Sequence, residues 1–312
     1  MFSGFFRLRR EVAWWQGLLF ALGCLLTVLG VWWLATHGEP EQRLLSPTVL
    51  PSPHETFATF PELWFDRALT RNTLASLRRV ALGFGLATAV GVPLGILCGC
   101  FPFLRAFFAP VSIFGRNIPV AALIPLTFSL FGIGELQKIM FIFIACVAFI
   151  LSDSARAIAE VHDRYIDTAY TLGAARRQVI LKVLVPLAFP SIFNSLRLLF
   201  GLAFGYIMLA ELVKFGGESG GLGDIIITSQ RRGPKEHILL VLIIIPIVAL
   251  AIDRGLFWIQ RELFPHRYGG SGILNRAVHV LLVGWERFKF LLVKPTPVAA
   301  IRQPTPSQEK AS

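Results

Sequence analysis

The chain has 312 residues, of which 54% are hydrophobic and only 16% charged, and its mean hydropathy is +0.64. Average soluble domains carry about 25% charged residues, and the apolar residues here form blocks of membrane length. This composition excludes an ordinary soluble enzyme, a disordered tail protein and a secreted disulfide scaffold. The net charge of +11 comes from basic residues at the ends of apolar blocks, which favours membrane anchoring over nucleic-acid binding.

Six apolar runs are predicted to cross the membrane. The first, Val12–Ala35, has paired tryptophans near both ends, as retained spans do, and it follows three arginines that predict a cytoplasmic N-terminus. The other five are predicted at Val80–Cys100, Phe107–Phe131, Ile139–Leu151, Ile192–Leu212 and Ile238–Leu256. Alternation then places residues 101–106, residues 152–191 and the C-terminal tail on the cytoplasmic side.

Glycines recur at spacing four in two of these runs. Gly91, Gly95 and Gly99 form a stripe on one helix face, and Gly201 and Gly205 repeat the spacing. Helix backbones can approach closely along such a face, and the triple stripe of Gly91, Gly95 and Gly99 is predicted to pack against a neighbouring helix.

Ionisable and polar residues interrupt the apolar runs at two places. Arg116 and Asn117, followed by Pro119, break the third run, and Glu211 closes the fifth. Such groups line a transport pathway or lie at helix ends. Pathway lining is favoured for Arg116 and Asn117, and both interpretations stay open for Glu211.

Catalytic and metal-binding motifs are absent from the sequence. There is no phosphate-binding loop, no HExxH and no GxSxG, and the glycine-rich stretch 216–223 lacks the Lys-Ser/Thr pair that grips phosphate. Asp163 and Asp167 lie four apart, which is more typical of solvated helix charges than of an acid–base pair. The four cysteines are predicted to be packed side chains. We therefore predict no enzyme activity, no cofactor and no metal.

The segment between the fourth and fifth runs is predicted to be a helix–turn–helix. Asp163–Leu172 and Ala174–Val185 are the two helices, and Gly173 suits a left-handed stop between them. Pro186 and Pro190 are predicted to break the chain before the fifth span. We call residues 163–186 the docking loop, because exposed small and basic residues on a rigid element favour binding of a partner.

The docking loop resembles that of ABC importer permeases of the binding-protein-dependent type. The family pattern is Glu-Ala-Ala, three residues, Gly, nine residues and Ile-x-Leu-Pro. The matching positions are Asp167, Thr168, Ala169, Gly173, Val183, Val185 and Pro186, with conservative departures at four of them. The resemblance runs from about residue 72 to 264 and is strongest to the nitrate/sulfonate/taurine/bicarbonate subgroup. Other matching segments are 72–80, 116–119, 124–126, 131–134, 210–211 and 220–223.

The resemblance implies an all-α membrane protein with six transmembrane helices, a type I importer core and a cytoplasmic coupling helix. Together with the apolar runs it predicts four regions: residues 1–35 with the first span, a periplasmic segment 36–71, the permease domain 72–264 and a cytoplasmic tail 265–312. Implied partners are separate ATP-binding subunits, a second permease subunit in a homodimer, and a periplasmic or lipid-anchored substrate-binding protein. The implied location is the inner membrane, with both termini cytoplasmic and no nucleic-acid partner.

The tail departs from the subgroup pattern. Residues 274–293 combine apolar spacings of three and four with internal charges, which predicts a helix lying on the lipids of the inner leaflet. The alternative is a helix docked on the transporter body.

Three functions remain open from the sequence. The first is an importer permease for a small anionic solute, or for a non-anionic one. The second is a membrane scaffold that docks ATPases without transporting. The third, a membrane enzyme, would need a catalytic cluster that the sequence does not show.

Overall fold

The computed structural model describes residues 13–39, 43–47, 49–213, 220–232 and 235–265. The predicted tail helix 274–293 and the first 12 residues lie outside this range. The chain divides into two compact units, Met1–Leu256 and Phe257–Ser312. In the described ranges all regular structure is helical, so the predicted all-α class is confirmed.

Five helices are long and apolar enough to cross a membrane, and a bent pair brings the number to six. The five are α1 (Trp14–Thr36), α4 (Leu69–Cys100), α7 (Glu135–Ala159), the run Arg176–Leu212 that ends in α10 (Val185–Leu212), and α12 (Lys235–Leu263). The pair consists of α5 (Pro102–Asn117) and, after the 3₁₀ turn Val120–Ala122, α6 (Leu123–Phe131), with a bend of 93°. The predicted runs fall on these helices, and the bend lies at the predicted break.

Short helices connect the spans on the N-terminal side. Ser52 and Glu55 form a capping box that starts α2 (Pro53–Ala58), and α3 (Phe60–Phe65) follows. The backbone N–H of Ser52 donates to Glu55, and this bond, with the nearby Arg43 guanidinium, lowers the pKa of the Glu55 carboxyl. Trp32 Nε1 of α1 donates to the Pro51 carbonyl over 2.9 Å.

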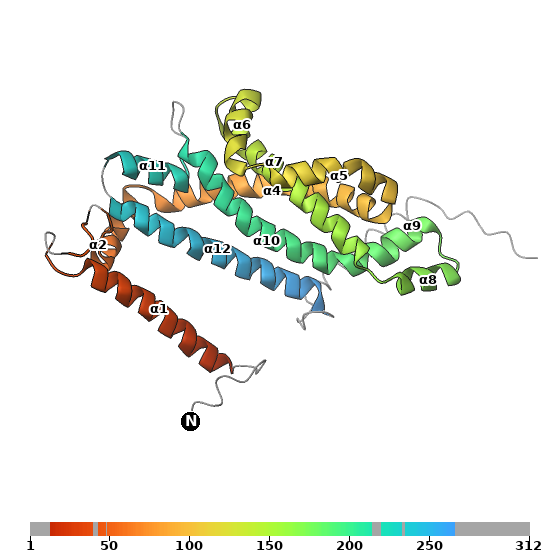
Figure 1. Ribbon diagram of the computed structural model, residues 1–312, viewed down its shortest axis with the longest axis horizontal. Coiled ribbons are helices and arrows are strands. Elements are labelled where there is room, and N and C mark those ends of the chain that lie inside the picture. The colour runs from red at the N-terminus through yellow and green to blue at the C-terminus, as the bar shows by residue number, and fades with distance from the viewer. Residues whose placement is uncertain (1–12, 40–42, 48, 214–219, 233–234, 266–312) are drawn as a thin grey trace, which may run out of the picture. The chain divides into compact units, whose positions relative to one another are not determined.

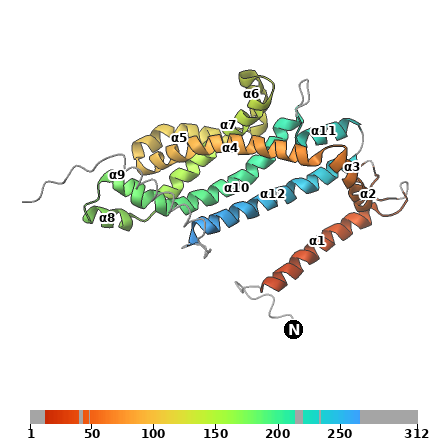
Figure 2. The ribbon, with the colours of Figure 1, turned by 180° about the vertical axis from the view of Figure 1, so that it is seen from behind.

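The helices α4, α7 and α10 lie side by side and build the main core (Figures 1 and 2). Val80 and Ala87 of α4, Phe141 and Ile142 of α7 and Phe204 of α10 are all buried within it. The glycine stripe of α4 faces α7. A Cβ on Gly91, Gly95 or Gly99 would lie 2.9, 2.5 or 2.6 Å from side-chain atoms of Ile150, Ser154 and Ile158 respectively. Spacing four on both helices therefore gives a continuous close contact.

The second glycine pair behaves differently. A Cβ on Gly201 or Gly205 of α10 would meet nothing within 4 Å in the described chain. Unlike the triple stripe, this pair does not bring two helices into close contact in the described part of the chain. The spacing alone does not decide which helix faces receive a neighbour.

The connection from α7 to α10 contains α8 (Asp163–Thr171), α9 (Arg176–Val179) and the π-helical segment η2 (Ile180–Leu184). The predicted break at Pro186 and Pro190 is wrong, because the helix continues to Leu212. In η2 the N–H of Val185 donates to the Ile180 carbonyl five residues back. This wider turn accommodates the following proline, which has no N–H to donate.

The close contact between α4 and α7 predicts opposite effects for two glycines of α4. Gly95→Ala should lower the thermal unfolding midpoint of the detergent-solubilised protein, because overpacking costs about 1–3 kcal/mol. Gly85→Ala is the matched control, since a Cβ there meets nothing within 4 Å. It should keep or raise the midpoint, because alanine is better than glycine in helices by about 1 kcal/mol. Equal midpoints for the two variants would contradict this packing.

Candidate functional site

The break between α5 and α6 carries the predicted pathway residues. Arg116 Nη1 donates to Ser152 Oγ over 2.7 Å and lies 3.7 Å from Asp153 Oδ1, both on α7. Asn117 is exposed, and its amide donates to the Ile113 carbonyl over 2.7 Å. Pro119 starts the 3₁₀ turn that redirects the chain. The break therefore contains the Arg116 guanidinium, which is bound to α7, beside the exposed Asn117 amide. The rest of the segment is apolar.

Glu211, at the end of α10, is fully buried and is bound from several sides. Ser76 Oγ donates to its carboxylate over 2.8 Å, Arg79 Nη1 over 2.7 Å and the Gly223 N–H over 3.0 Å. A buried carboxylate needs such donors to stay ionised at low free-energy cost. These contacts favour a structural role for Glu211, and pathway lining stays an untested prediction.

The glycine-rich segment that opens α11 (Leu222–Arg232) wraps around this carboxylate. Gly220 and Gly221 have φ of +56° and +114°, and a Cβ on Gly221 would collide with the Glu211 carboxylate. A Cβ on Gly223 would lie 2.6 Å from Glu211 Cβ. Glycine is thus required here for backbone conformation and for close approach.

Arg79 joins this site to α7. It is 2% exposed, donates from Nε to Glu135 Oε2 over 2.8 Å, pairs a second time with that carboxylate through Nη2, and donates from Nη1 to the Gly220 carbonyl over 2.8 Å. Asn72 Oδ1 accepts from the Gly221 N–H over 2.8 Å. We call Asn72, Ser76, Arg79, Glu135 and Glu211 the Arg79 cluster. It connects α4, α7, α10 and α11.

Sequence reasoning assigned no role to Ser76, Arg79 or Glu135, although it identified Glu211. A signal was present, because Ser76 and Arg79 lie three apart and therefore share a face of an apolar helix. Their partners lie 56 to 135 residues away, and no local pattern reveals such pairings.

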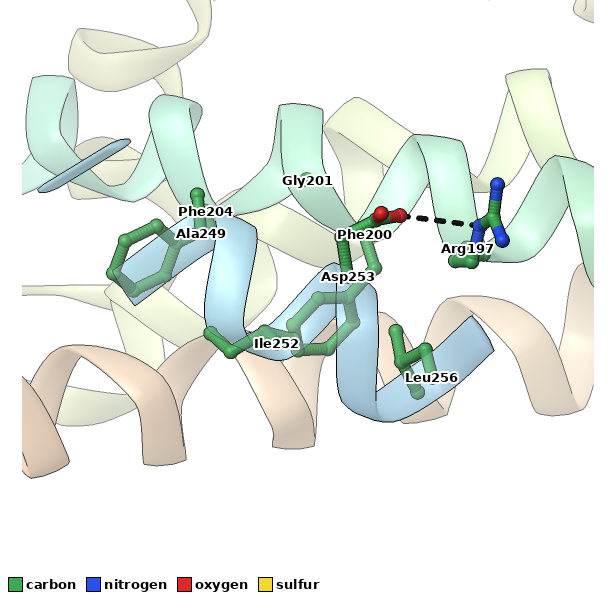
Figure 3. A pocket seen from close by; sticks show the side chains of 8 residues that line it. All are labelled: Arg197, Phe200, Gly201, Phe204, Ala249, Ile252, Asp253 and Leu256. Atoms are coloured by element: carbon green, nitrogen blue, oxygen red, sulfur yellow. Dashed lines mark ion pairs between the residues drawn. The ribbon is translucent and has the colours of Figure 1, made fainter. Parts of the chain in front are cut away.

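A second pair of charges inside the apolar helices also went unnoticed in the sequence. Arg197 Nε of α10 lies 3.1 Å from Asp253 Oδ1 of α12. Figure 3 shows this pair beside a small cavity, which Phe200, Gly201 and Phe204 line from one helix and Ala249, Ile252 and Leu256 from the other. The Arg197–Asp253 ion pair and the apolar side chains around it connect α10 with α12. Gly201 contributes no side chain to this face of α10.

The docking loop forms a compact element on the end of α7. Ala169, Val179, Leu184 and Ala188 are buried together with Ile158 of α7. Gly173 has φ of +80°, and the N–H groups of Gly173 and Ala174 donate to the carbonyls of Tyr170 and Ala169, which closes α8 in a left-handed cap.

Its other predicted residues divide between surface and interior. Asp167, Thr168, Gly173 and Pro186 are exposed, Ala169 is buried, and Val183 and Val185 are half-buried. The loop also exposes Tyr165, Tyr170 and Leu172, the last by 82%. These three apolar side chains were not among the predicted docking residues.

No group of three His, Cys, Asp or Glu residues able to hold a metal ion occurs in the described part of the chain.

The Arg79 cluster predicts strongly coupled substitutions. Arg79→Met should destabilise the protein by about 3–5 kcal/mol, because it leaves Glu211 buried without its cation. Glu211→Gln, combined with Arg79→Met, should cost less than the sum of the two single changes. Thermal unfolding of the purified protein measures all three variants, with Arg71→Met, whose side chain is exposed on the same helix, as the control. If the cost of the double change equals the sum of the two single costs, Arg79 and Glu211 are not coupled as the geometry indicates.

Comparison with known proteins places the chain in a family. The profile described as binding-protein-dependent transport system inner membrane component matches residues 91–265. The chain is similar to the taurine transport system permease protein TauC of Escherichia coli, with 31% identity over 250 residues, 78% of this chain and 88% of that protein. It is also similar to the bicarbonate transport system permease protein CmpB of Synechococcus elongatus, with 32% identity over 251 residues, 79% of this chain and 89% of that protein.

The fold is that of a solved importer subunit. An inward-facing structure of the MetNI methionine ABC transporter matches with a TM-score of 0.57 and 23% identity, covering 65% of this chain and 97% of that chain. The profile covers the core from Gly91 in the glycine stripe to the end of α12. The chain belongs to the family of binding-protein-dependent transport system inner membrane components.

Proposed function

We propose that this permease imports a small anionic solute through a pathway that passes the break between α5 and α6. As a family member the chain is the membrane subunit of an ABC importer, and ATP hydrolysis belongs to separate subunits. The observation that carries the proposal is the 93° bend, which places Arg116 and an exposed Asn117 inside an apolar segment. A cation and an amide donor are suited to an anion in transit.

The relatives support the anionic class. One is named for taurine, which carries a sulfonate, and another for bicarbonate. Asp153, at 3.7 Å from Arg116, leaves room for a competing anion on the same guanidinium. Glu211 is not needed in this pathway, because its carboxylate is already enclosed by the Arg79 cluster.

The orientation follows from the docking loop. It binds the ATPase, so it faces the cytoplasm, and the Arg79 cluster at the opposite ends of α4 and α10 faces the periplasm. Both termini are then cytoplasmic. This orientation places the basic residues that precede α1 on the cytoplasmic side, in agreement with the positive-inside rule.

The assembly comprises two copies of this chain, two ATP-binding subunits and a substrate-binding protein. Each docking loop presents Tyr165, Tyr170 and Leu172 to a groove of one ATPase, with Asp167 and Thr168 on the same short helix. Ala169 and Val179 belong to the same buried cluster as Ala157 and Ile158 of α7. Movement of the ATPase is therefore passed to the spans through packed side chains.

Substitution of Gly173 tests the docking loop. Gly173→Val should reduce substrate-stimulated ATPase activity of the assembled transporter, because a side chain at φ of +80° costs about 1–2 kcal/mol and more when β-branched. Gly173→Asn is the matched control, since asparagine tolerates this conformation and a Cβ there meets nothing within 4 Å. Normal solute uptake by the Gly173→Val variant would contradict the assignment of the docking loop as the site that binds the ATPase.

Labelling at position 117 tests the pathway. In a background without the four native cysteines, Asn117→Cys should react with a hydrophilic maleimide, at a rate that changes when solute is added or ATP is trapped. Ala87→Cys, at a fully buried position of α4, should stay unreactive. A reactivity at 117 that no solute or nucleotide alters would place this residue outside the pathway.

A further inference from the structure

A separate cavity of about 280 Å³ lies where α4 ends, α5 begins and α7 ends. One face of α5 lines it with residues at spacings of three and four, as a single helix face requires. The lining residues are Arg105, Phe108, Ala109, Ser112 and Ile113 from α5, Leu151, Ser152, Ala155 and Arg156 from α7, and Cys98 from α4.

Near the cavity, α5 and α7 are in close contact. Further along α5, Gly115 lets the two helices touch, because a Cβ there would lie 2.5 Å from Ala148 Cβ. The cavity lies on the other side of this contact from the break, between the beginning of α5 and the end of α7, where its lining includes Arg105 and Arg156.

The charges at the cavity are unbalanced. Arg105 and Arg156 are exposed, and neither guanidinium group forms a hydrogen bond or ion pair within the described part of the chain. The residues that line the cavity include no carboxylate. Two guanidinium groups that share one cavity form a site for a negatively charged group with several oxygens.

Hydroxyl groups and apolar walls complete the site. Ser152 Oγ accepts from Arg116 over 2.7 Å, which leaves its O–H free to donate to a ligand. Ser112 supplies a second hydroxyl, and Phe108, Ile113 and Leu151 supply apolar surface. An arginine that only snorkels towards lipid headgroups needs neither the cavity nor the hydroxyls.

We propose that this cavity binds an oxoanion headgroup, a phosphate, sulfate or sulfonate, through Arg105 and Arg156, with any alkyl stem lying against Phe108 and Leu151. The headgroup comes either from an anionic phospholipid or from a free anion in solution. The assignment does not depend on which solute the permease carries, because Arg105 and Arg156 lie near the ends of α5 and α7, although Ser152 connects the cavity with Arg116 at the break.

The test measures binding of hexanesulfonate to the full-length protein by calorimetry in phosphatidylcholine nanodiscs. Arg105→Gln and Arg156→Gln should each weaken binding about tenfold or more, because each removes charge-assisted hydrogen bonds. Arg254→Gln is the matched control, since that arginine is exposed on α12 and does not line the cavity. It should leave the affinity within about twofold, which corresponds to less than half a kilocalorie per mole.

A second variant separates the cavity from general surface charge. Ala109→Phe fills the cavity and keeps both arginines, and it should abolish binding. Retained binding by this variant, or equal weakening by Arg254→Gln, would overturn the assignment. Circular dichroism and a single elution peak show that each variant is folded.

Two further arms identify the source of the headgroup. If a phospholipid is the natural ligand, phosphatidylglycerol in the nanodisc competes with hexanesulfonate, and native mass spectrometry shows one such lipid retained by the unsubstituted protein and lost from Arg105→Gln. If a free anion is the ligand, inorganic sulfate competes and phosphatidylglycerol does not. The proposal is contradicted if neither phosphatidylglycerol nor sulfate competes with hexanesulfonate and both arginine variants bind hexanesulfonate as tightly as the unsubstituted protein.

Discussion

The contact between α4 and α7 is the constraint on which the other features of this permease depend. Gly91, Gly95 and Gly99 carry no side chain, so the α4 backbone lies directly on Ile150, Ser154 and Ile158. In lipid the hydrophobic effect does little to hold helices together, and close van der Waals packing replaces it. Because both helices are fixed along this line, the residues at their two ends also have fixed positions: Arg79 and Glu135 at one end, Cys98 and Arg156 at the other.

The ion pairs between these helices also depend on the fixed positions of their backbones. Where water is absent, an ionisable side chain must find its partner in the protein. Arg79 therefore connects Glu135 with Glu211, and Arg197 pairs with Asp253. A buried pair of this kind adds little net stability over an apolar replacement, but loss of one partner is costly. We interpret the Arg79 cluster as a device that fixes α11 and its glycine segment against the ends of α4, α7 and α10.

The docking loop is also attached to the membrane-spanning helices by buried side chains and by a continuous helix. The buried side chains Ala169, Val179 and Leu184 attach the loop to α7, and the run Arg176–Leu212 continues into α10 without interruption. A displacement of the loop thus reaches two membrane helices directly. The π-helical turn at η2 keeps this run continuous although Pro186 and Pro190 lie within it.

The helical class, the spans, the break at Arg116–Pro119 and the left-handed stop at Gly173 were predictable from the amino-acid sequence, because each depends on local hydropathy, proline or glycine chemistry. The sequence also predicted the glycine face of α4 as a packing surface. Three facts could be learned only from the packed helices: Gly201 lines a small cavity beside α12, Glu211 is enclosed by Ser76 and Arg79, and Arg105 and Arg156 share one cavity. These facts depend on contacts between residues far apart in the chain. Spacing along one helix defines a face, but only the packed neighbours decide what that face meets.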